Sequence, residues 1–82
     1  MRIDDYLSTV GVIKRRTIAK ELGQNGLIDV GGRTVKPSYQ VKVNDIIQIK
    51  GKRAFALEVL KLPTGSVAKE SRAEYFREIT GP

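Results

Sequence analysis

The spacing of apolar residues changes from a helical to an extended pattern at Asn25-Gly26, and this change divides the chain into two structural parts. Before it, apolar residues recur every three or four positions, as they do along one face of a helix. After it, short runs rich in β-branched residues alternate with Gly, Pro and Asn, as in successive strands. Because Asn and Gly tolerate the left-handed conformation of helix ends, the first part should end here. The sequence therefore predicts an α+β fold.

Two short helices are predicted in the first part, over residues 2–10 and 14–22. The first has apolar residues at i, i+3, i+4 and i+7, and the second has them at i, i+1 and i+4. Gly11 separates the helices, which favours an αα-hairpin with its corner at Gly11-Val12. The residues expected on the apolar faces are Ile3, Tyr6, Leu7 and Val10, followed by Ile18, Ala19 and Leu22.

Two pairs of strands are predicted in the second part, over residues 27–30 with 33–35 and over residues 46–50 with 55–59. Gly31-Gly32 is a two-residue hairpin signal, Pro37 interrupts the second strand, and Asn44-Asp45 marks a turn before the third. Alternation places Ile47 and Ile49 on one face, and Phe55, Leu57 and Val59 on one face of the partner strand. We expect the helical hairpin to lie on one side of a small, curved, mostly antiparallel sheet.

The last quarter of the chain has a different local pattern. Pro63-Thr64-Gly65-Ser66 is rich in turn-forming residues, and residues 68–79 have a helical pattern, with Ala73, Phe76 and Ile79 able to pack back on the domain. We therefore expect one domain over residues 1–62, followed by a linker and a C-terminal helix over residues 63–82.

The composition limits the chemistry that the chain can perform. Its 82 residues suffice for one small domain, and they include neither Cys nor His. The commonest general base and metal ligand is thus missing, as is thiolate chemistry, so we expect no enzyme, no metal and no cofactor. No apolar run approaches the roughly 18 residues of a membrane-spanning helix, and the first residues do not resemble a secretory signal. We expect a cytoplasmic protein.

Positive charge is concentrated in the first three quarters of the chain. The net charge is +6, and residues 1–62 hold 12 of the 15 Lys and Arg and 6 of the 9 Asp and Glu. Lys14, Arg15 and Arg16 stand where the second helix should open, although cations there oppose the helix dipole. Arg16 and Lys20 lie one turn apart on the exposed side, a spacing at which like charges repel. This arrangement favours an anionic partner such as nucleic acid, the alternative being a merely solvated surface.

Four motifs in a fixed order resemble a known RNA-binding domain. They are Arg2-Ile-Asp-x-Tyr-Leu, Ile13-Lys-Arg-Arg-Thr-x-Ala-Lys20, Gly26-x-Ile-x-Val-x-Gly32 and Lys36-Pro-Ser-x-x-Val41-x-x-x-Asp45. Together they resemble the domain named after small-subunit ribosomal protein S-four, over roughly residues 1–60. The small free-standing branches, the RqcP group and the heat-shock protein fifteen group, are the most similar.

The resemblance implies that the protein binds the phosphate backbone of structured RNA. It implies Arg2 and Arg16 as central contacts, with Lys14, Arg15 and Lys20 extending the patch, and Asp4 as the residue that orients Arg2 or Arg15. The chain departs from the pattern at Asp5, Ser8 and Gly11, where relatives often carry Lys or Arg, which shifts the expected contacts toward the second helix. Further candidate RNA contacts, each of which could equally be a solvated surface residue, are Arg33, Lys36, Lys50, Lys52 and Arg53.

For the RqcP group, the implied function is binding to rRNA and peptidyl-tRNA on obstructed large ribosomal subunits, while a partner, RqcH, extends the stalled peptide with alanines. An alternative is a general structured-RNA-binding or ribosome-assembly and recycling factor of the heat-shock protein fifteen type. A third possibility is a module that docks acidic proteins or a membrane surface, but the chain has no amphipathic stretch with bulky exposed apolar residues to support it. We expect a monomer that does not bind membranes.

Overall fold

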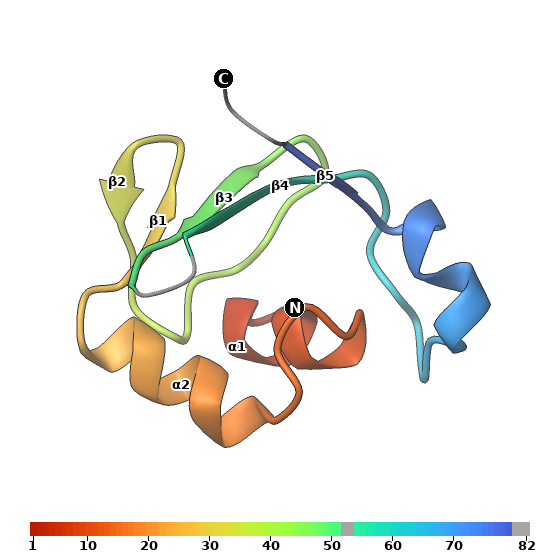
Figure 1. Ribbon diagram of the computed structural model, residues 1–82, viewed down its shortest axis with the longest axis horizontal. Helices are drawn as coiled ribbons and strands as arrows, with labels where there is room; N and C mark the ends of the chain where they lie inside the picture. The colour runs from red at the N-terminus through yellow and green to blue at the C-terminus, as the bar shows by residue number, and fades with distance from the viewer. Residues whose placement is uncertain (52–53, 80–82) are drawn as a thin grey trace.

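The computed structural model describes residues 1–51 and 54–79. Two helices, α1 (Ile3–Thr9) and α2 (Arg16–Gln24), lie on one side of a five-stranded sheet (Figure 1). The predicted α+β class and both predicted helices are therefore confirmed. Gly11, at the corner between the helices, has a φ of 82°, an angle that glycine adopts without strain.

The sheet has the order β2-β1-β3-β4-β5, and all neighbouring strands are antiparallel. Gly31 and Gly32, with φ of 58° and 84°, form the turn between the first two strands. Two-residue hairpin turns with positive φ at both positions match the twist of the strands, so the predicted hairpin is confirmed. The strands are β1 (Ile28–Val30), β2 (Arg33–Thr34), β3 (Ile46–Ile49), β4 (Phe55–Val59) and β5 (Phe76–Glu78).

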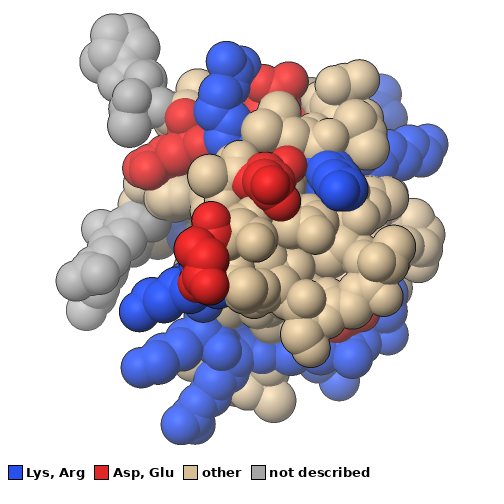
Figure 2. Space-filling model, turned by 90° about the vertical axis from the view of Figure 1, so that its right-hand side faces the viewer, with Lys and Arg blue, Asp and Glu red and all other residues tan. Residues whose placement is uncertain are grey.

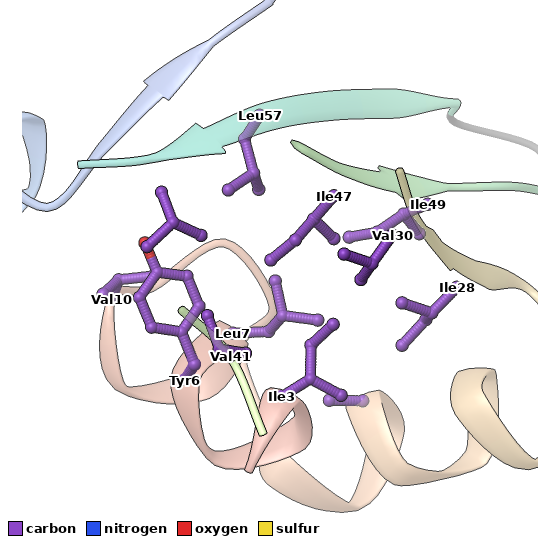
Figure 3. Packing of buried hydrophobic residues seen from close by; sticks show 12 residues of the cluster. Ile3, Tyr6, Leu7, Val10, Ile28, Val30, Val41, Ile47, Ile49 and Leu57 are labelled. Atoms are coloured by element: carbon purple, nitrogen blue, oxygen red, sulfur yellow. The ribbon is translucent and has the colours of Figure 1, made fainter. Parts of the chain in front are cut away.

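The hydrophobic core lies between α1 and the sheet. Figure 3 shows Leu7 and Ile3 of α1 pointing toward Ile47 and Leu57 of the sheet, and all four side chains are fully buried. β3 and β4 pair so that Ile47 lies opposite Leu57, which puts both on the core face as predicted. Tyr6 is also fully buried, which confirms the whole apolar face expected for the first helix.

The C-terminal segment is helical only in its first half, so its helix is shorter than predicted. Residues Lys69–Glu74 form a short 3-10 helix, η1, and Phe76–Glu78 form β5, which pairs with β4. The physical reason is the free edge of β4, whose backbone groups need hydrogen-bond partners that a strand can supply and a helix cannot. Phe76 and Tyr75 pack against the core from this segment, as a packed-back tail was expected to do.

The hydroxyl of Tyr6 links the first helix to this segment. It donates a hydrogen bond of 2.8 Å to the carbonyl oxygen of Tyr75. The same carbonyl accepts hydrogen bonds from the backbone N–H groups of Leu60 and Lys61. The buried phenol thus has the partner that buried polar groups require, and the C-terminal segment is held to the core by it.

The second helix begins two residues later than predicted. Arg15 is its N-cap, with an extended conformation (φ −131°, ψ 138°), and its carbonyl accepts the N–H groups of Ile18 and Ala19. Lys14 and Arg15 therefore belong to the loop before α2. The N–H of Ile13 donates to the carbonyl of Leu7, which ties this loop to α1 and delays the start of the helix.

The face that α2 turns to the core also differs from the prediction. Ala19 and Gly23, one turn apart, are buried, whereas Ile18 is 45% exposed. A Cβ atom at Gly23 would lie only 2.7 Å from Cγ of Pro37, so the backbone of α2 approaches this proline closely. The small residues Ala19 and Gly23 allow that approach and occupy the face of α2 toward the core, so Ile18 lies beside this face and is partly exposed. The expectation that Ile18 faces the core is wrong.

Candidate nucleic-acid interface

A fully buried carboxylate, that of Asp4, lies where the N-terminal ends of α1 and α2 meet. Arg2 donates two hydrogen bonds to it, from Nε to Oδ1 over 3.2 Å and from Nη2 to Oδ2 over 3.1 Å. Nε of Arg16 lies 3.8 Å from Oδ2, and the backbone N–H of Asp5 donates to Oδ1 over 2.7 Å. We call this group the Arg2-Asp4-Arg16 cluster.

Burial makes the carboxylate of Asp4 dependent on these partners, because a buried charge is costly unless it is paired and hydrogen-bonded. The side chain of Asp4 is 1% exposed, whereas those of Arg2 and Arg16 are 42% and 53% exposed. The carboxylate therefore holds both guanidinium groups from the protein side and leaves them accessible to solvent. From the sequence, Asp4 is expected to orient Arg2 or Arg15. The structure places Arg2 beside it, together with Arg16, which is not expected there.

Backbone contacts hold Arg2 in place, in addition to the contacts of its side chain with Asp4. Arg2 is the N-cap of α1 and has an extended conformation (φ −69°, ψ 147°). Its carbonyl accepts the N–H of Tyr6 over 2.9 Å, and it forms an isolated antiparallel bridge with Gln40. Arg2 is thus held between the first helix and the loop that leads to β3, so the position of its Cα atom, from which the guanidinium extends, is fixed.

Lys14, Arg15 and Lys20 extend the cluster along the same edge of the molecule. All three are exposed, the first two in the loop before α2 and the third one turn after Arg16. Figure 2 shows Lys and Arg gathered along the lower edge of the molecule, at the height that α2 has in Figure 1, while most Asp and Glu of the face shown lie higher. We call this surface the basic edge; it consists of Arg2, Lys14, Arg15, Arg16 and Lys20.

The other candidate cations lie elsewhere. Arg33 is on the edge strand β2, and Lys36 is in the loop that follows; both are exposed. Lys50, after β3, lies with Nζ 3.3 Å from Oδ1 of Asp29, so it forms an ion pair with the neighbouring strand. Lys52 and Arg53 lie outside the described residues. The structure therefore gathers the cations of the two helix starts, and it also brings Lys50 of the sheet to the same hollow that Lys14 lines.

One cation that lies against the end of α1, Arg72, could not be placed there from the sequence. The guanidinium of Arg72, in η1, packs against Gly11 at the corner of the helical hairpin, where a Cβ atom would lie 2.3 Å from Cζ of the arginine. Glycine leaves the space that the guanidinium fills. Because the two residues are distant in the sequence, only the fold brings this positive charge to the end of α1.

Two kinds of feature are absent from the described residues, 1–51 and 54–79. No group of three or more Asp and Glu residues there could hold a metal ion. No helix there is long and apolar enough to cross a membrane.

Residues 1–47 match the S4 domain family. Over 98% of this chain and 91% of the relative, the sequence is 40% identical to a protein of Streptococcus pneumoniae named RQC P-site tRNA stabilizing factor. A protein of Bacillus subtilis with the same name is 33% identical over 92% of this chain and 88% of its own length.

Solved structures agree with the fold. Heat-shock protein 15 of Vibrio cholerae, described as trimeric, superposes with a TM-score of 0.86 at 21% identity, over 96% of this chain and 81% of that one. A hypothetical protein, HP1423, superposes with a TM-score of 0.82 at 30% identity, over the full length of both chains. The matched residues 1–47 contain the whole basic edge and the buried carboxylate beneath it. The chain is therefore a member of the S4 domain family and, within it, of the family of RQC P-site tRNA stabilizing factors.

Proposed function

We propose that this protein is an RNA-binding cofactor of ribosome-associated quality control, which holds peptidyl-tRNA on an obstructed large ribosomal subunit. The basic edge contacts RNA phosphates, and Arg2 and Arg16 set the position of the protein on the RNA. The observation that carries the proposal is the Arg2-Asp4-Arg16 cluster, which presents two oriented, half-exposed guanidinium groups. The name shared by relatives at 33% and 40% identity supports the assignment to quality control.

The geometry of the cluster suits phosphate binding. Arginine presents a planar fork that can donate to two phosphate oxygens, whereas lysine is a mobile point charge. A guanidinium already oriented by Asp4 loses less conformational freedom when it binds. The major groove of A-form RNA is too deep and narrow for side chains to read its bases, so a small rigid basic surface recognises backbone and shape. We therefore expect little sequence specificity.

The partners follow from this role. We propose that the basic edge contacts both rRNA of the large subunit and the peptidyl-tRNA, and that the protein supports alanine tailing by RqcH. It performs no catalysis itself, acts as a monomer, and works in the cytoplasm, where ribosomes are found. The candidate cations of the sheet, namely Arg33, Lys36, Lys50, Lys52 and Arg53, are proposed as a second and weaker set of contacts.

A second candidate function is general binding of structured RNA during ribosome assembly or recycling, of the heat-shock protein 15 type. The TM-score of 0.86 with that protein favours a shared fold. The two functions differ in what they require of the ribosome. The quality-control role requires a large subunit that still carries tRNA, whereas the general role does not.

Sedimentation of tagged protein from cell lysate through a sucrose gradient tests the proposal. The wild type should travel with large subunits, and the RNA recovered with it should include tRNA. Arg16→Ala should stay at the top of the gradient although it remains folded, because Arg16 is 53% exposed and Asp4 keeps its hydrogen bonds from Arg2 and from the N–H of Asp5.

The matched control is Arg77→Ala. It also removes one arginine, but from the edge strand β5 and not from the basic edge. Arg77 pairs with Glu58 and is 69% exposed. The control should sediment like the wild type. Association with every RNA fraction, unchanged in Arg16→Ala, would contradict the proposal and favour the general role.

A further inference from the structure

An apolar groove of about 770 Å³ lies between the loop before α2, the exposed side of α2 and the ends of β3 and β4 that adjoin them. Its volume is within the range of pockets that take small organic groups. Apolar side chains from all these elements line it, including Ile13, Ile18, Leu22 and Phe55. The side chain of Ile18, whose exposure is unexpected from the sequence, therefore faces this groove and does not project from a convex surface.

Two lysines also line the groove. Lys14 is exposed and precedes Arg15 and Arg16 of the basic edge, so the groove is continuous with that surface. Lys50 belongs to the opposite wall, and its side chain is 42% exposed although Nζ lies 3.3 Å from Oδ1 of Asp29. An ammonium group has three donors, so this ion pair leaves Lys50 able to contact a further anion. The groove thus combines an apolar floor with cations on two sides.

A ligand that fits this combination carries an apolar face next to negative charge. An unpaired nucleotide does so, since its base has two apolar faces and its phosphates are anionic. A paired duplex does not, because its bases are stacked and their faces are covered. Lys14 is two residues from Arg16, so an RNA strand that reaches the basic edge also reaches the groove.

We infer that the groove takes up one unpaired nucleobase of the bound RNA, with the adjoining phosphates on Lys14 and Lys50. The base packs against Ile18 and Phe55. This inference rests on the proposed function, because it assumes that the basic edge binds RNA. It adds that the protein distinguishes RNA with an accessible base from fully paired RNA.

Ile18→Ala tests the inference, and Val43→Ala is its matched control. Both shorten a β-branched side chain to a single methyl group, and both side chains are nearly half exposed, 45% for Ile18 and 47% for Val43. Only the first of the two lines the groove. Two labelled RNAs of equal length serve as probes, a hairpin with one bulged nucleotide in its stem and the same hairpin fully paired, and fluorescence anisotropy measures their affinities.

Ile18→Ala should bind the bulged RNA at least about fourfold more weakly than the wild type, the effect expected when about one methylene group is no longer buried by the ligand. Its affinity for the paired RNA should not change, and Val43→Ala should bind both RNAs like the wild type. Equal binding of the bulged RNA by both variants would overturn the inference. So would an equal loss by Ile18→Ala on both RNAs, which would indicate a general effect on the fold.

Two further outcomes separate this inference from the proposed function. If both RNAs bind in a manner that depends on Arg16 but not on Ile18, the proposed function stands and the groove is not a base site. If the wild type binds neither RNA, both proposals fail. A short acidic peptide with regularly spaced leucines is the third probe: binding of this peptide that depends on Ile18, without any effect of Ile18→Ala on RNA, would identify the groove as a protein-docking site and overturn the inference.

Discussion

Nε of Arg16 lies 3.8 Å from Oδ2 of Asp4, so the first residue of α2 is paired with a buried carboxylate of α1. This ion pair joins the two helices at their N-terminal ends. The same oxygen accepts a hydrogen bond from Arg2, so both guanidinium groups share one reference point. The protein itself therefore sets the spacing between the two guanidinium groups. A fixed spacing is what a surface needs if it is to recognise the shape of an RNA backbone.

Arg16→Lys should separate the effect of charge from that of geometry. The substitution keeps the positive charge but loses the planar fork, so affinity for tRNA should fall by about fivefold to tenfold, the equivalent of one lost hydrogen bond of about 1 to 1.4 kcal/mol. The salt dependence should stay the same. The measurement is a titration of tRNA at several salt concentrations.

The same titrations test the number of contacts. If the five cations of the basic edge each contact a phosphate, the log-log slope of the wild type should be about −3.5 to −4.5, and Arg16→Ala should reduce its magnitude by about 0.7 to 0.9. Arg77→Ala serves again as the control and should leave the slope unchanged. A binding constant of the wild type that does not vary with salt would rule out the mechanism.

Asp4→Asn should weaken RNA binding although it makes the protein more positive. The amide keeps the size of the side chain but loses the charge that holds Arg2 and Arg16. Their guanidinium groups should become less ordered, and the free energy of unfolding should fall by about 1–3 kcal/mol because hydrogen bonds to a buried charged group are lost. Chemical denaturation and tRNA titration measure the two effects. Tighter binding by Asp4→Asn would mean that Asp4 acts only through its negative charge and does not position the arginines.

Tyr6→Phe should change the response of stability to high pH. Burial raises the pKa of Tyr6 well above its ordinary value of 10.0, so the folded protein keeps the proton that the unfolded chain releases. The stabilisation linked to this proton is complete below pH 10 and is lost as the pH rises further, by about 1.4 kcal/mol per pH unit. The variant should be about 1 kcal/mol less stable at neutral pH, since it lacks the hydrogen bond to the carbonyl of Tyr75, but its stability should fall less between pH 10 and 12. Denaturation curves at neutral and alkaline pH compare the two proteins, and an identical alkaline decline would contradict the argument.

Gly23→Ala should destabilise the protein despite the higher helix propensity of alanine. Its Cβ would lie 2.7 Å from Cγ of Pro37, a rigid ring that cannot turn away. Overpacking of this kind costs about 1–3 kcal/mol, which exceeds the gain of about 1 kcal/mol from replacing glycine in a helix. Gln24→Ala, at an exposed position of the same helix, is the control and should change thermal stability little. A melting temperature of Gly23→Ala above that of the wild type would mean that α2 can shift away from the proline.

The sequence predicts well where local chemistry decides the structure. The apolar spacing of α1, the Gly31-Gly32 hairpin and the shared faces of the strands over residues 46–49 and 55–59 all follow from rules of local conformation and alternation, and the structure confirms them. The position of Arg2 at the start of α1 is equally local. These features need no knowledge of distant residues.

The sequence predicts local structure poorly where a contact with a residue distant in the sequence determines it. Residues 76–78 have a helical pattern but form a strand, because the edge of β4 offers them hydrogen bonds. Ile18 has the spacing of a core residue but is displaced by the contact between Gly23 and Pro37. The arginine that joins Arg2 at Asp4 is likewise chosen by the angle of the helical hairpin, which apolar spacing does not specify.

The hydrogen bond from Tyr6 to the carbonyl of Tyr75 spans 69 positions of the chain. During synthesis the tyrosine therefore leaves the ribosome long before its acceptor does. Until then the first helix contains a phenol whose native acceptor has not yet been made, and the edge of β4 lacks its neighbour β5. The helical hairpin that carries the basic edge therefore reaches its final packing only after residue 75 has been synthesised, so a product truncated before this residue would carry the cations of the basic edge without the segment that packs against α1.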